Sequence, residues 1–315
     1  MKNFNVIGVM SGTSLDGVDI VYVKFTLNES WRFKIINSKT YKYADSTVDM
    51  LSDISKKNLE EIKEIDVVYS NKLAKIINEF IEEFSINKID FVSSHGHTAI
   101  HDPSNLITYQ IGNLSTLSTE INQKVICDFR VQDVKLGGEG APLVPVGEKY
   151  LFQEYDSFIN LGGFANISKH DGESLIAYDI CPVNIILNNL SKKIGKDYDN
   201  KGSIASSGKL ILNLYDQLQK LEYYQLDPPK SLGIEWVDKN MIPLINKYSD
   251  YPIEDLLNTL SNHIANQISN NLKEIDKALI TGGGAYNNYL IDIISSKSDS
   301  EIIIPSKNII EFKEA

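Results

Sequence analysis

The chain has 315 residues, of which 42% are hydrophobic and 23% charged, and its formal net charge is −11 at pH 7. This length allows two domains, and this balance is typical of a soluble globular protein. The acidic excess argues against a nucleic-acid partner, because no basic stripe could follow a phosphate backbone. No segment is typical of a membrane span or a secretory signal, and Cys127 and Cys181 suggest no disulfide framework. We therefore expect a cytoplasmic protein with no membrane partner.

The first third of the chain alternates strand and helix patterns. Short apolar runs predict strands, and apolar residues three or four positions apart predict the buried faces of helices. In chain order the predictions are strands at 5–9, 18–25 and 31–39, a helix over 73–84, a strand at 88–93, a helix at 114–120 and a strand at 124–127.

The remainder of the chain repeats this order. The patterns predict strands at 157–161, 164–169 and 175–180, a helix that begins near Pro182, a second helix over 256–272 and a strand at 277–281. Two halves of this kind suggest an internal duplication, which we divide into domains 1–131 and 132–315. A cleft between such halves is where a ligand is expected.

The segment between the first two strands contains candidate phosphate-binding groups. The small residues Ser11, Gly12, Thr13 and Ser14 can surround a phosphate with amides and hydroxyls, and Gly17 lets the chain turn. Asp16 and Asp19 follow closely, and their carboxylates suit a phosphate that carries Mg²⁺. The Walker lysine pattern is absent. The alternative is a polar hairpin that binds nothing.

Two further glycine turns follow predicted strands. Gly162 and Gly163 follow the strand at 157–161, and the run Gly282, Gly283 and Gly284 follows the strand at 277–281. One such turn is weak support for a ligand, whereas three at matching places in a duplicated frame favour a nucleotide. Two turns could hold a polyphosphate and the third a flat base. Purely structural turns are the alternative.

Asp179 ends a predicted strand immediately before a predicted helix. This is where α/β folds present reactive groups, and a carboxylate there can take a proton from a hydroxyl or from water. The alternative is a carboxylate that only stabilises the positive end of the helix.

Asp128 and Arg130 flank Phe129 at the end of the predicted strand 124–127. Alternation along a strand would point both side chains to the same side, where the arginine suits a carboxylate or phosphate. A surface salt bridge between them or with a neighbour is the alternative.

His95, His97 and His101 lie close together in sequence, but no acidic residue or cysteine is at metal-ligand spacing. Polar contacts of these histidines to a sugar are the better explanation. The glycine-rich run 137–142 could close over a substrate or serve only as a linker.

These motifs together resemble the anhydro-N-acetylmuramic acid kinase family, within the actin, sugar kinase and Hsp70 superfamily. They follow the family's order over nearly the whole chain, and MSGTSLDG and GGEGAPLVP are the most specific. The matching segments are MSGTSLDGVD (10–19), SHGHTAIHDP (94–103), YQIGN (109–113), DFRVQDVKLGGEGAPLVP (128–145), NLGGFANIS (160–168), AYDICPVN (177–184), DNKGSIASSGK (199–209), PKSLG (229–233) and ITGGGAYNN (280–288).

The resemblance implies a duplicated ribonuclease H-like α/β fold of the actin and hexokinase type, with ATP and Mg²⁺ bound in a cleft between the domains. It implies an enzyme that hydrolytically opens the 1,6-anhydro bond of a cell-wall amino sugar and phosphorylates O6 during recycling. Asp179 would be the base and Asp16 a metal ligand, and the family resemblance also suggests a homodimer. Residues implied to contact the sugar are His97, Asp128, Arg130 and Asn184, and those implied to contact ATP include Asn166 and Asn287 beside the three glycine turns.

Three departures from the family pattern bear on this implication. His97 replaces a usual glutamine, and Cys181 and Val183 replace two glycines beside Asp179. Larger residues there could change the substrate or the turnover. The chain also stops at residues 311–315, where family members usually continue into a helix that returns to the first domain, and we expect this helix to be missing. Alternatives to the kinase are therefore a catalytically weak sugar- or nucleotide-binding homologue and a related sugar kinase with another acceptor.

Overall fold

The computed structural model describes residues 1–12, 15–171 and 174–315. These residues form two compact units: unit 1 comprises Met1–Leu151 and Phe312–Ala315, and unit 2 comprises Phe152–Glu311. The division differs from the predicted boundary between residues 131 and 132, because the segment 132–151 belongs to unit 1. Helix α5 (Val144–Leu151) in this segment contacts strand β3 (Trp31–Lys42) of the same unit.

Unit 1 is built on a mixed sheet with the strand order β3-β2-β1-β4-β7. The strands β1, β2 and β3 form an antiparallel meander, and β4 and β7 are added in parallel beside β1. A separate hairpin of β5 and β6 was not predicted. The strands are β1 (Lys2–Met10), β2 (Gly17–Leu27), β3, β4 (Phe91–Ser94), β5 (His97–Asp102), β6 (Ile107–Ile111) and β7 (Val125–Ile126).

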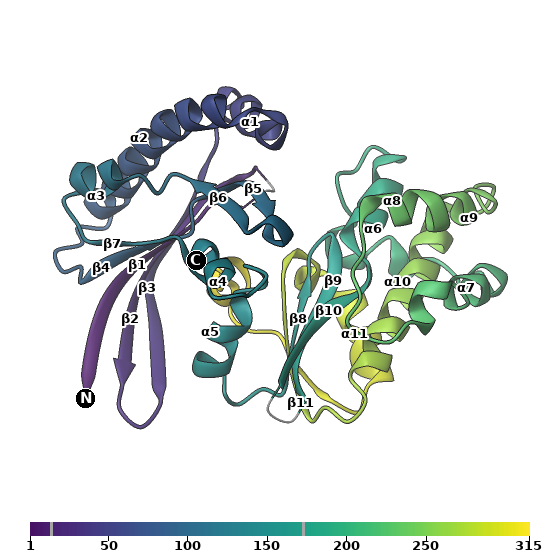
Figure 1. Ribbon diagram of the computed structural model, residues 1–315. Helices are drawn as coiled ribbons and strands as arrows, with labels where there is room; N and C mark the ends of the chain where they lie inside the picture. The colour runs from purple at the N-terminus through teal and green to yellow at the C-terminus, as the bar shows by residue number, and fades with distance from the viewer. Residues whose placement is uncertain (13–14, 172–173) are drawn as a thin grey trace. The chain divides into compact units, whose positions relative to one another are not determined.

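Helix α2 (Leu59–Glu83) covers one face of this sheet (Figure 1), where its apolar residues pack on buried residues of β1 and β2. It begins earlier than the predicted helix over 73–84, because Asn58 and Glu61 form a reciprocal capping box with the first turn. The other helical segments of unit 1 are α1 (Asp45–Ser52), α3 (Ser115–Ile121), α4 (Phe129–Lys135), α5 and the short 3₁₀ helices Ile54–Lys56 and Pro103–Asn105.

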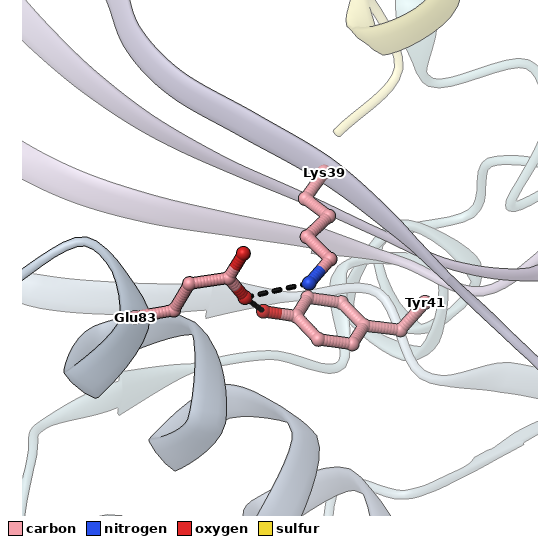
Figure 2. A network of polar contacts seen from close by, with 3 residues as sticks. All are labelled: Lys39, Tyr41 and Glu83. Atoms are coloured by element: carbon pink, nitrogen blue, oxygen red, sulfur yellow. Dashed lines mark hydrogen bonds and ion pairs between the residues drawn. The ribbon is translucent and has the colours of Figure 1, made fainter.

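The last turn of α2 is tied to β3 by polar contacts (Figure 2). Glu83 Oε2 accepts hydrogen bonds from Lys39 Nζ at 2.6 Å and from Tyr41 OH at 2.9 Å. The ammonium of Lys39 also lies 4.4 Å from the centre of the Tyr41 ring. Because Lys39 and Glu83 are partly exposed, this contact stabilises the helix–strand packing only modestly.

The opposite face of the β2–β3 region carries a smaller cluster in which Phe312 packs on Val21 and Val23. The end of the chain therefore lies on unit 1, where Lys313 Nζ and the buried Glu148 form an ion pair of 2.5 Å. A Cβ atom on Gly8 would be within 1.8 Å of the Ala315 carbonyl oxygen. Phe312, the last residue of α12 (Lys307–Phe312), and the three residues after it belong to unit 1.

Unit 2 repeats the topology of unit 1, with the strand order β10-β9-β8-β11-β12. An antiparallel meander of β8, β9 and β10 is followed by β11 and β12 in parallel beside β8. The predicted duplicated α/β fold is thereby confirmed. The strands are β8 (Ser157–Leu161), β9 (Phe164–Asp171), β10 (Ser174–Pro182), β11 (Lys277–Thr281) and β12 (Glu301–Ile303).

Helix α10 (Ile253–Asn271) packs on the sheet of unit 2 and is buried along most of its length (Figure 1). Pro182 does not begin a helix as predicted: it ends β10, and α6 begins at Asn184. Ile194 is 43% exposed because α6 ends at Lys192. The remaining helices are α6 (Asn184–Lys192), α7 (Leu212–Gln219), α8 (Ile234–Trp236), α9 (Ile242–Asn246), α11 (Asn288–Lys297), a π-helix at Val237–Met241 and 3₁₀ helices at Asn200–Gly202, Ala205–Ser207, Glu222–Gln225 and Gly283–Tyr286.

Among the helices formed by the described residues, none combines the length and apolar character needed to cross a membrane. The longest, α2, carries many charged residues on its exposed face. Its amphipathic pattern is that of a helix packed on one side against a core.

Candidate functional site

The predicted site residues fall into one group in each unit. In unit 1, Ser11 follows β1 and is only 2% exposed. Its hydroxyl lies 2.7 Å from Tyr43 OH and accepts a hydrogen bond from Tyr69 OH at 2.6 Å. The two tyrosine hydroxyls are themselves 2.6 Å apart. Ser11, at the start of the first glycine loop, is therefore held by the buried hydroxyls of Tyr43 and Tyr69.

The middle of this loop, Thr13 and Ser14, lies outside the described residues. Gly12 is half-buried. Gly17 begins β2, and a Cβ atom there would be 2.4 Å from the Tyr41 carbonyl oxygen. Close packing between β2 and β3 therefore explains this glycine without a ligand.

Asp16 is exposed at the turn between β1 and β2, and Asp19 lies further along β2. Asp19 Oδ1 accepts a hydrogen bond of 2.5 Å from Thr40 Oγ1. The pKa of Tyr43 is raised mainly by burial and additionally by the negative charges of Asp16 and Asp19.

His97 is 2% exposed, so the ring is not placed for the direct sugar contact that we expected. Its Nδ1 atom is 3.4 Å from Ser11 Oγ. Burial lowers the pKa of His97 to about 4, with a contribution from His95, against the effect of hydrogen bonds with the backbone of Gly12 and Ser11. The structure therefore assigns His97 to the support of the first glycine loop.

Asp128 and Arg130 do not share a strand end as predicted. The strand β7 ends at Ile126, Asp128 precedes α4, and Arg130 lies in its first turn. Asp128 is exposed and adopts a left-handed backbone conformation with φ of 61°. Such a conformation is uncommon for a residue with a side chain and is concentrated at functional sites. Asn113 Nδ2 donates to Asp128 Oδ1 over 3.4 Å.

Arg130 contacts two groups of unit 1 rather than Asp128. Its Nε donates to His95 Nε2 at 2.7 Å, and its Nη1 donates to the Gly140 carbonyl oxygen at 2.6 Å. His95 Nδ1 lies 2.7 Å from the Gly96 carbonyl oxygen. A neutral His95 that carries its proton on Nδ1 satisfies both contacts. Burial lowers the pKa of His95, in agreement with a neutral ring.

The glycine-rich loop 137–142 is tied to α4. The backbone amide of Gly140 donates to Asp133 Oδ2 at 2.7 Å, while its carbonyl oxygen accepts from Arg130. A Cβ atom on Gly138 would be 2.2 Å from the same carboxylate oxygen. In this conformation the loop is therefore an ordered extension of α4.

In unit 2, strand register aligns three polar residues. Asn166 pairs with Asn160 on β8 and with Asp179 on β10. The residues on either side of each are buried in the core of unit 2, so these three share the other face of the sheet. Neighbouring side chains on one face of a sheet are within contact distance. The row places amide groups beside the predicted base.

Asp179 is half-buried and held at three atoms. Its Oδ2 accepts a hydrogen bond of 2.9 Å from the Leu232 amide, its carbonyl oxygen accepts one from Tyr223 OH, and its amide donates to the Lys230 carbonyl oxygen. Burial raises the pKa of the Asp179 carboxyl, and the bond from Leu232 opposes this effect. The described residues provide no hydrogen bond to Oδ1, which leaves this atom to take a proton.

Cys181 and Val183 are completely buried in the core of unit 2. A β-bulge between Asp179 and Cys181 shifts the pairing of β10 with β9, so that Ile180 and Cys181 both point inward. The two departures from the family pattern therefore enlarge the core. Their side chains are not on the face that carries Asp179.

The glycines of unit 2 divide into two kinds. A Cβ atom on Gly282 would be 2.1 Å from Asn160 Oδ1, and one on Gly284 would be 2.7 Å from Leu161 Cβ, so packing explains both. A Cβ atom on Gly162, Gly163 or Gly283 would meet nothing closer than 3.5 Å. At these three positions neither packing nor a positive φ requires glycine. A ligand that approaches the backbone would require it.

Asn184 and Asn287 both make internal contacts. Asn184 Nδ2 donates to the Leu161 carbonyl oxygen at 3.0 Å and lies 3.8 Å from a Cβ atom built on Gly283. Asn287 caps α11 by accepting a hydrogen bond from the Leu290 amide at 3.1 Å. Asn184 therefore lies among the glycine turns, whereas Asn287 has a clear structural role.

No group of three or more histidine, cysteine, aspartate or glutamate side chains within residues 1–12, 15–171 and 174–315 is arranged to hold a metal ion. Mg²⁺ typically uses only one or two carboxylates and takes its other ligands from phosphates and water. The exposed Asp16 fits that kind of site.

The sequence patterns missed several residues that the fold brings to these groups. Tyr43 and Tyr69 are far apart in the chain, and His95 was seen only as part of a histidine cluster. Asn160 could have been found, because strand alternation places it on the same face as Asn166. Leu232 acts through its backbone amide, for which side-chain patterns carry no signal.

Comparisons with known proteins agree with these motifs. A family model described as anhydro-N-acetylmuramic acid kinase matches residues 4–309. The anhydro-N-acetylmuramic acid kinase of Bacillus cereus (strain Q1) is 30% identical over 316 residues, covering 92% of this chain and 83% of the relative. The protein with the same name in Francisella tularensis subsp. novicida (strain U112) is 31% identical over 330 residues, covering 94% of this chain and 85% of the relative.

A solved structure shares the fold at low sequence identity. Component A of the (R)-2-hydroxyglutaryl-CoA dehydratase of Acidaminococcus fermentans matches with a TM-score of 0.50 and 11% identity, covering 99% of this chain and 95% of that one. This likeness concerns the arrangement of helices and strands alone.

Proposed function

The chain belongs to the anhydro-N-acetylmuramic acid kinase family, and from this premise we propose that it uses ATP to phosphorylate 1,6-anhydro-N-acetylmuramic acid. The products are N-acetylmuramic acid 6-phosphate and ADP, formed in cell-wall sugar recycling. The observation that carries the proposal is the carboxylate of Asp179. It is half-buried, its pKa is raised, and it lies on β10 beside Asn166 of β9.

The glycine turns are proposed to bind ATP. A Cβ atom on Gly162, Gly163 or Gly283 would make only ordinary van der Waals contacts, so the fold itself does not require glycine there. Backbone amides at such turns can cradle phosphate oxygens. In unit 1, Ser11 and Gly12 would contribute the corresponding loop, with Thr13 and Ser14 assigned from the sequence motif.

Asp16 is proposed to hold Mg²⁺ together with phosphate oxygens of ATP. A bound Mg²⁺ supplies positive charge that offsets the charge of the phosphates. The exposed carboxylate of Asp16, with Asp19 nearby, provides the oxygen ligands that this cation prefers.

The proton transfer is assigned to Asp179. Its Oδ1 takes a proton from water, the water oxygen bonds to the anomeric carbon, and the bond from that carbon to O6 breaks. The freed O6 then bonds to the γ-phosphorus of ATP, and the bond to the bridging oxygen breaks to release ADP. The bond from the Leu232 amide to Oδ2 fixes the orientation of the carboxylate. A carboxyl pKa raised by burial makes Asp179 a better base than an exposed aspartate.

Sugar recognition is proposed for Asp128 and Arg130, with His95 acting on the arginine. Asp128 is exposed with a left-handed backbone, and Arg130 retains donors beyond those used by His95 and Gly140. A guanidinium suits the carboxylate of the sugar's lactyl group. His97 is removed from this set because its ring is buried.

One assay tests the kinase proposal. The purified protein is incubated with ATP, Mg²⁺ and the anhydro sugar, and ADP and sugar phosphate are both measured. We expect the two products in equal amounts, and we expect neither when the sugar is replaced by N-acetylglucosamine. Formation of ADP without sugar phosphate would contradict the proposed acceptor. A cytoplasmic location and a homodimer are further proposals, for which fractionation and sedimentation are the tests.

A further inference from the structure

The tyrosine hydroxyls below the first glycine loop have no part in the chemistry described so far. Tyr69, on α2, is completely buried, and Tyr43 follows the end of β3 and is half-buried. Both hydroxyls lie within 2.7 Å of Ser11 Oγ and 2.6 Å of each other. Three elements distant in the sequence therefore meet at one small hydroxyl.

The three hydroxyls can satisfy one another completely. Each hydroxyl donates one hydrogen bond and accepts at least one. Tyr69 donates to Ser11, and the remaining two contacts close a ring in which Ser11 donates to Tyr43 and Tyr43 donates to Tyr69. His97 Nδ1 lies 3.4 Å from Ser11 Oγ, and the His97 ring also contacts the backbone of Gly12. A buried network that is fully satisfied rigidifies its members.

Tyr69 is itself held firmly. Its ring contacts Gly112, where a Cβ atom would be 2.8 Å from Tyr69 Cε1 and where φ is +94°. One turn earlier on α2, Asp66 accepts hydrogen bonds from the Gly112 amide at 2.7 Å and from Tyr109 OH at 2.6 Å. The hydroxyl of Tyr69 is thus fixed relative to β6 as well as to Ser11.

We propose that Tyr43 and Tyr69 are positioning residues of the first phosphate loop: their hydroxyls hold Ser11 Oγ in the core of unit 1 and so fix the backbone that enters Gly12. This inference rests on the proposed binding of ATP by that loop. A loop held in its binding conformation before the ligand arrives loses less conformational freedom on binding. Loss of either hydroxyl should therefore weaken ATP binding.

The test uses the full chain with the substitutions Tyr69→Phe and Tyr43→Phe. We measure the Kd of ATP by calorimetry and the KM values of ATP and of the anhydro sugar in steady state. We expect the Kd and KM of ATP to rise roughly 5- to 10-fold, as for a lost buried hydrogen bond, while the KM of the sugar stays within about twofold. A purely structural role would lower the thermal midpoint and leave the ratio of the KM of ATP to the KM of the sugar unchanged.

Tyr22→Phe is the matched control. Tyr22 lies on β2 of the same unit, and its hydroxyl donates to the Lys88 carbonyl oxygen at 2.8 Å, away from Ser11. This variant loses one tyrosine hydrogen bond and should keep the KM of ATP. An equal rise of that KM in Tyr22→Phe would overturn the inference.

Ser11→Ala removes the shared partner and provides a second measurement. Combined with Tyr69→Phe, it should weaken ATP binding by less than the sum of the two single losses, because both changes remove the hydrogen bond between Tyr69 OH and Ser11 Oγ. Additive losses would contradict the inference. A wild-type protein that fails to bind ATP would overturn the proposed function as well, whereas unchanged Kd values in both tyrosine variants overturn only the positioning role.

Discussion

The first glycine loop of unit 1 and the Gly162–Gly163 turn of unit 2 occupy the same place in a repeated topology, but they are supported differently. Ser11 is held by a buried group of hydroxyls from Tyr43 and Tyr69. The turn at Gly162 and Gly163 follows β8, which is packed in an apolar core, and a Cβ atom at either glycine would clash with no neighbour.

This difference shows that one topology can fix the conformation of two corresponding turns, both proposed to bind phosphate, in two ways. In unit 1 the conformation depends on specific hydrogen bonds, each of which is lost with a single hydroxyl. In unit 2 the conformation of the turn depends on the pairing of β8 with β9 and on the two glycines, which carry no side chain. We therefore expect the first glycine loop of unit 1 to be sensitive to polar substitutions and to protonation of His97, and the Gly162–Gly163 turn of unit 2 to be sensitive to added bulk.

The largest effect is expected at the base in unit 2. Asp179→Asn should lower kcat roughly 10²- to 10⁴-fold, because it removes the proton acceptor but keeps the size of the side chain. Stopped assays of ADP and sugar phosphate measure the change, and ATP calorimetry serves as the control for an intact turn. Full activity in this variant would show that another group takes the proton.

Acid should affect the support of the loop in unit 1. The pKa of His97 is lowered from 6.5 in the unfolded chain to about 4 in the folded protein, so its stabilising contribution is complete above pH 6.5 and is lost as the pH falls toward 4. The loss approaches roughly 3 kcal/mol at pH 4.

The measurement for His97 is urea unfolding of the wild type and His97→Gln between pH 7 and pH 4. We expect the difference between the two free energies of unfolding to change across this range, since His263, whose pKa burial lowers to about 3, is common to both proteins. Parallel curves would mean that His97 is exposed or charged in the folded state.

The smallest effect is expected at the open turn of unit 2. A methyl group on Gly163 would lie 3.9 Å from Ile185 Cβ, so Gly163→Ala should leave the thermal midpoint nearly unchanged. The KM of ATP should rise roughly tenfold, or about 1.4 kcal/mol, because the methyl group occupies space proposed for a phosphate.

Gly147→Ala is the control for this substitution. Gly147 lies in α5 of unit 1, where a Cβ atom meets nothing within 4 Å, so the change should be neutral or slightly stabilising and should not alter the KM of ATP. If Gly163→Ala behaves like Gly147→Ala, the Gly162–Gly163 turn does not bind ATP.

Most of the sheet framework could be predicted from local patterns. The strands Ser157–Leu161 and Lys277–Thr281 match their predicted bounds, because each is a short apolar run bounded by turn residues. The longer helix α10 was also found from its periodicity. The two halves of the sequence have the same order of strand and helix patterns, and the two sheets accordingly have the same topology. Local sequence carries this information because strand alternation and helix periodicity are properties of neighbouring residues.

The errors arose where distant contacts override local preference. Arg130 was placed on a strand end, but it lies in α4 and contacts His95 and Gly140. The boundary at 131 failed to include α5, which contacts β3 of unit 1. Pro182 looked suited to a helix start, yet it pairs with Phe164 at the end of β10 after a bulge.

By itself, the sequence determined the family and the duplicated α/β order, and it supplied the glycine turns and the carboxylate on which the proposed chemistry rests. Only the tertiary structure decided which of those residues face a site and which support one. Cys181 and His97 differ from the family pattern at separate motifs, one in each unit, and both side chains are buried. The physical reason is that burial and hydrogen-bond partners depend on register, on bulges and on residues far along the chain, which no local pattern specifies.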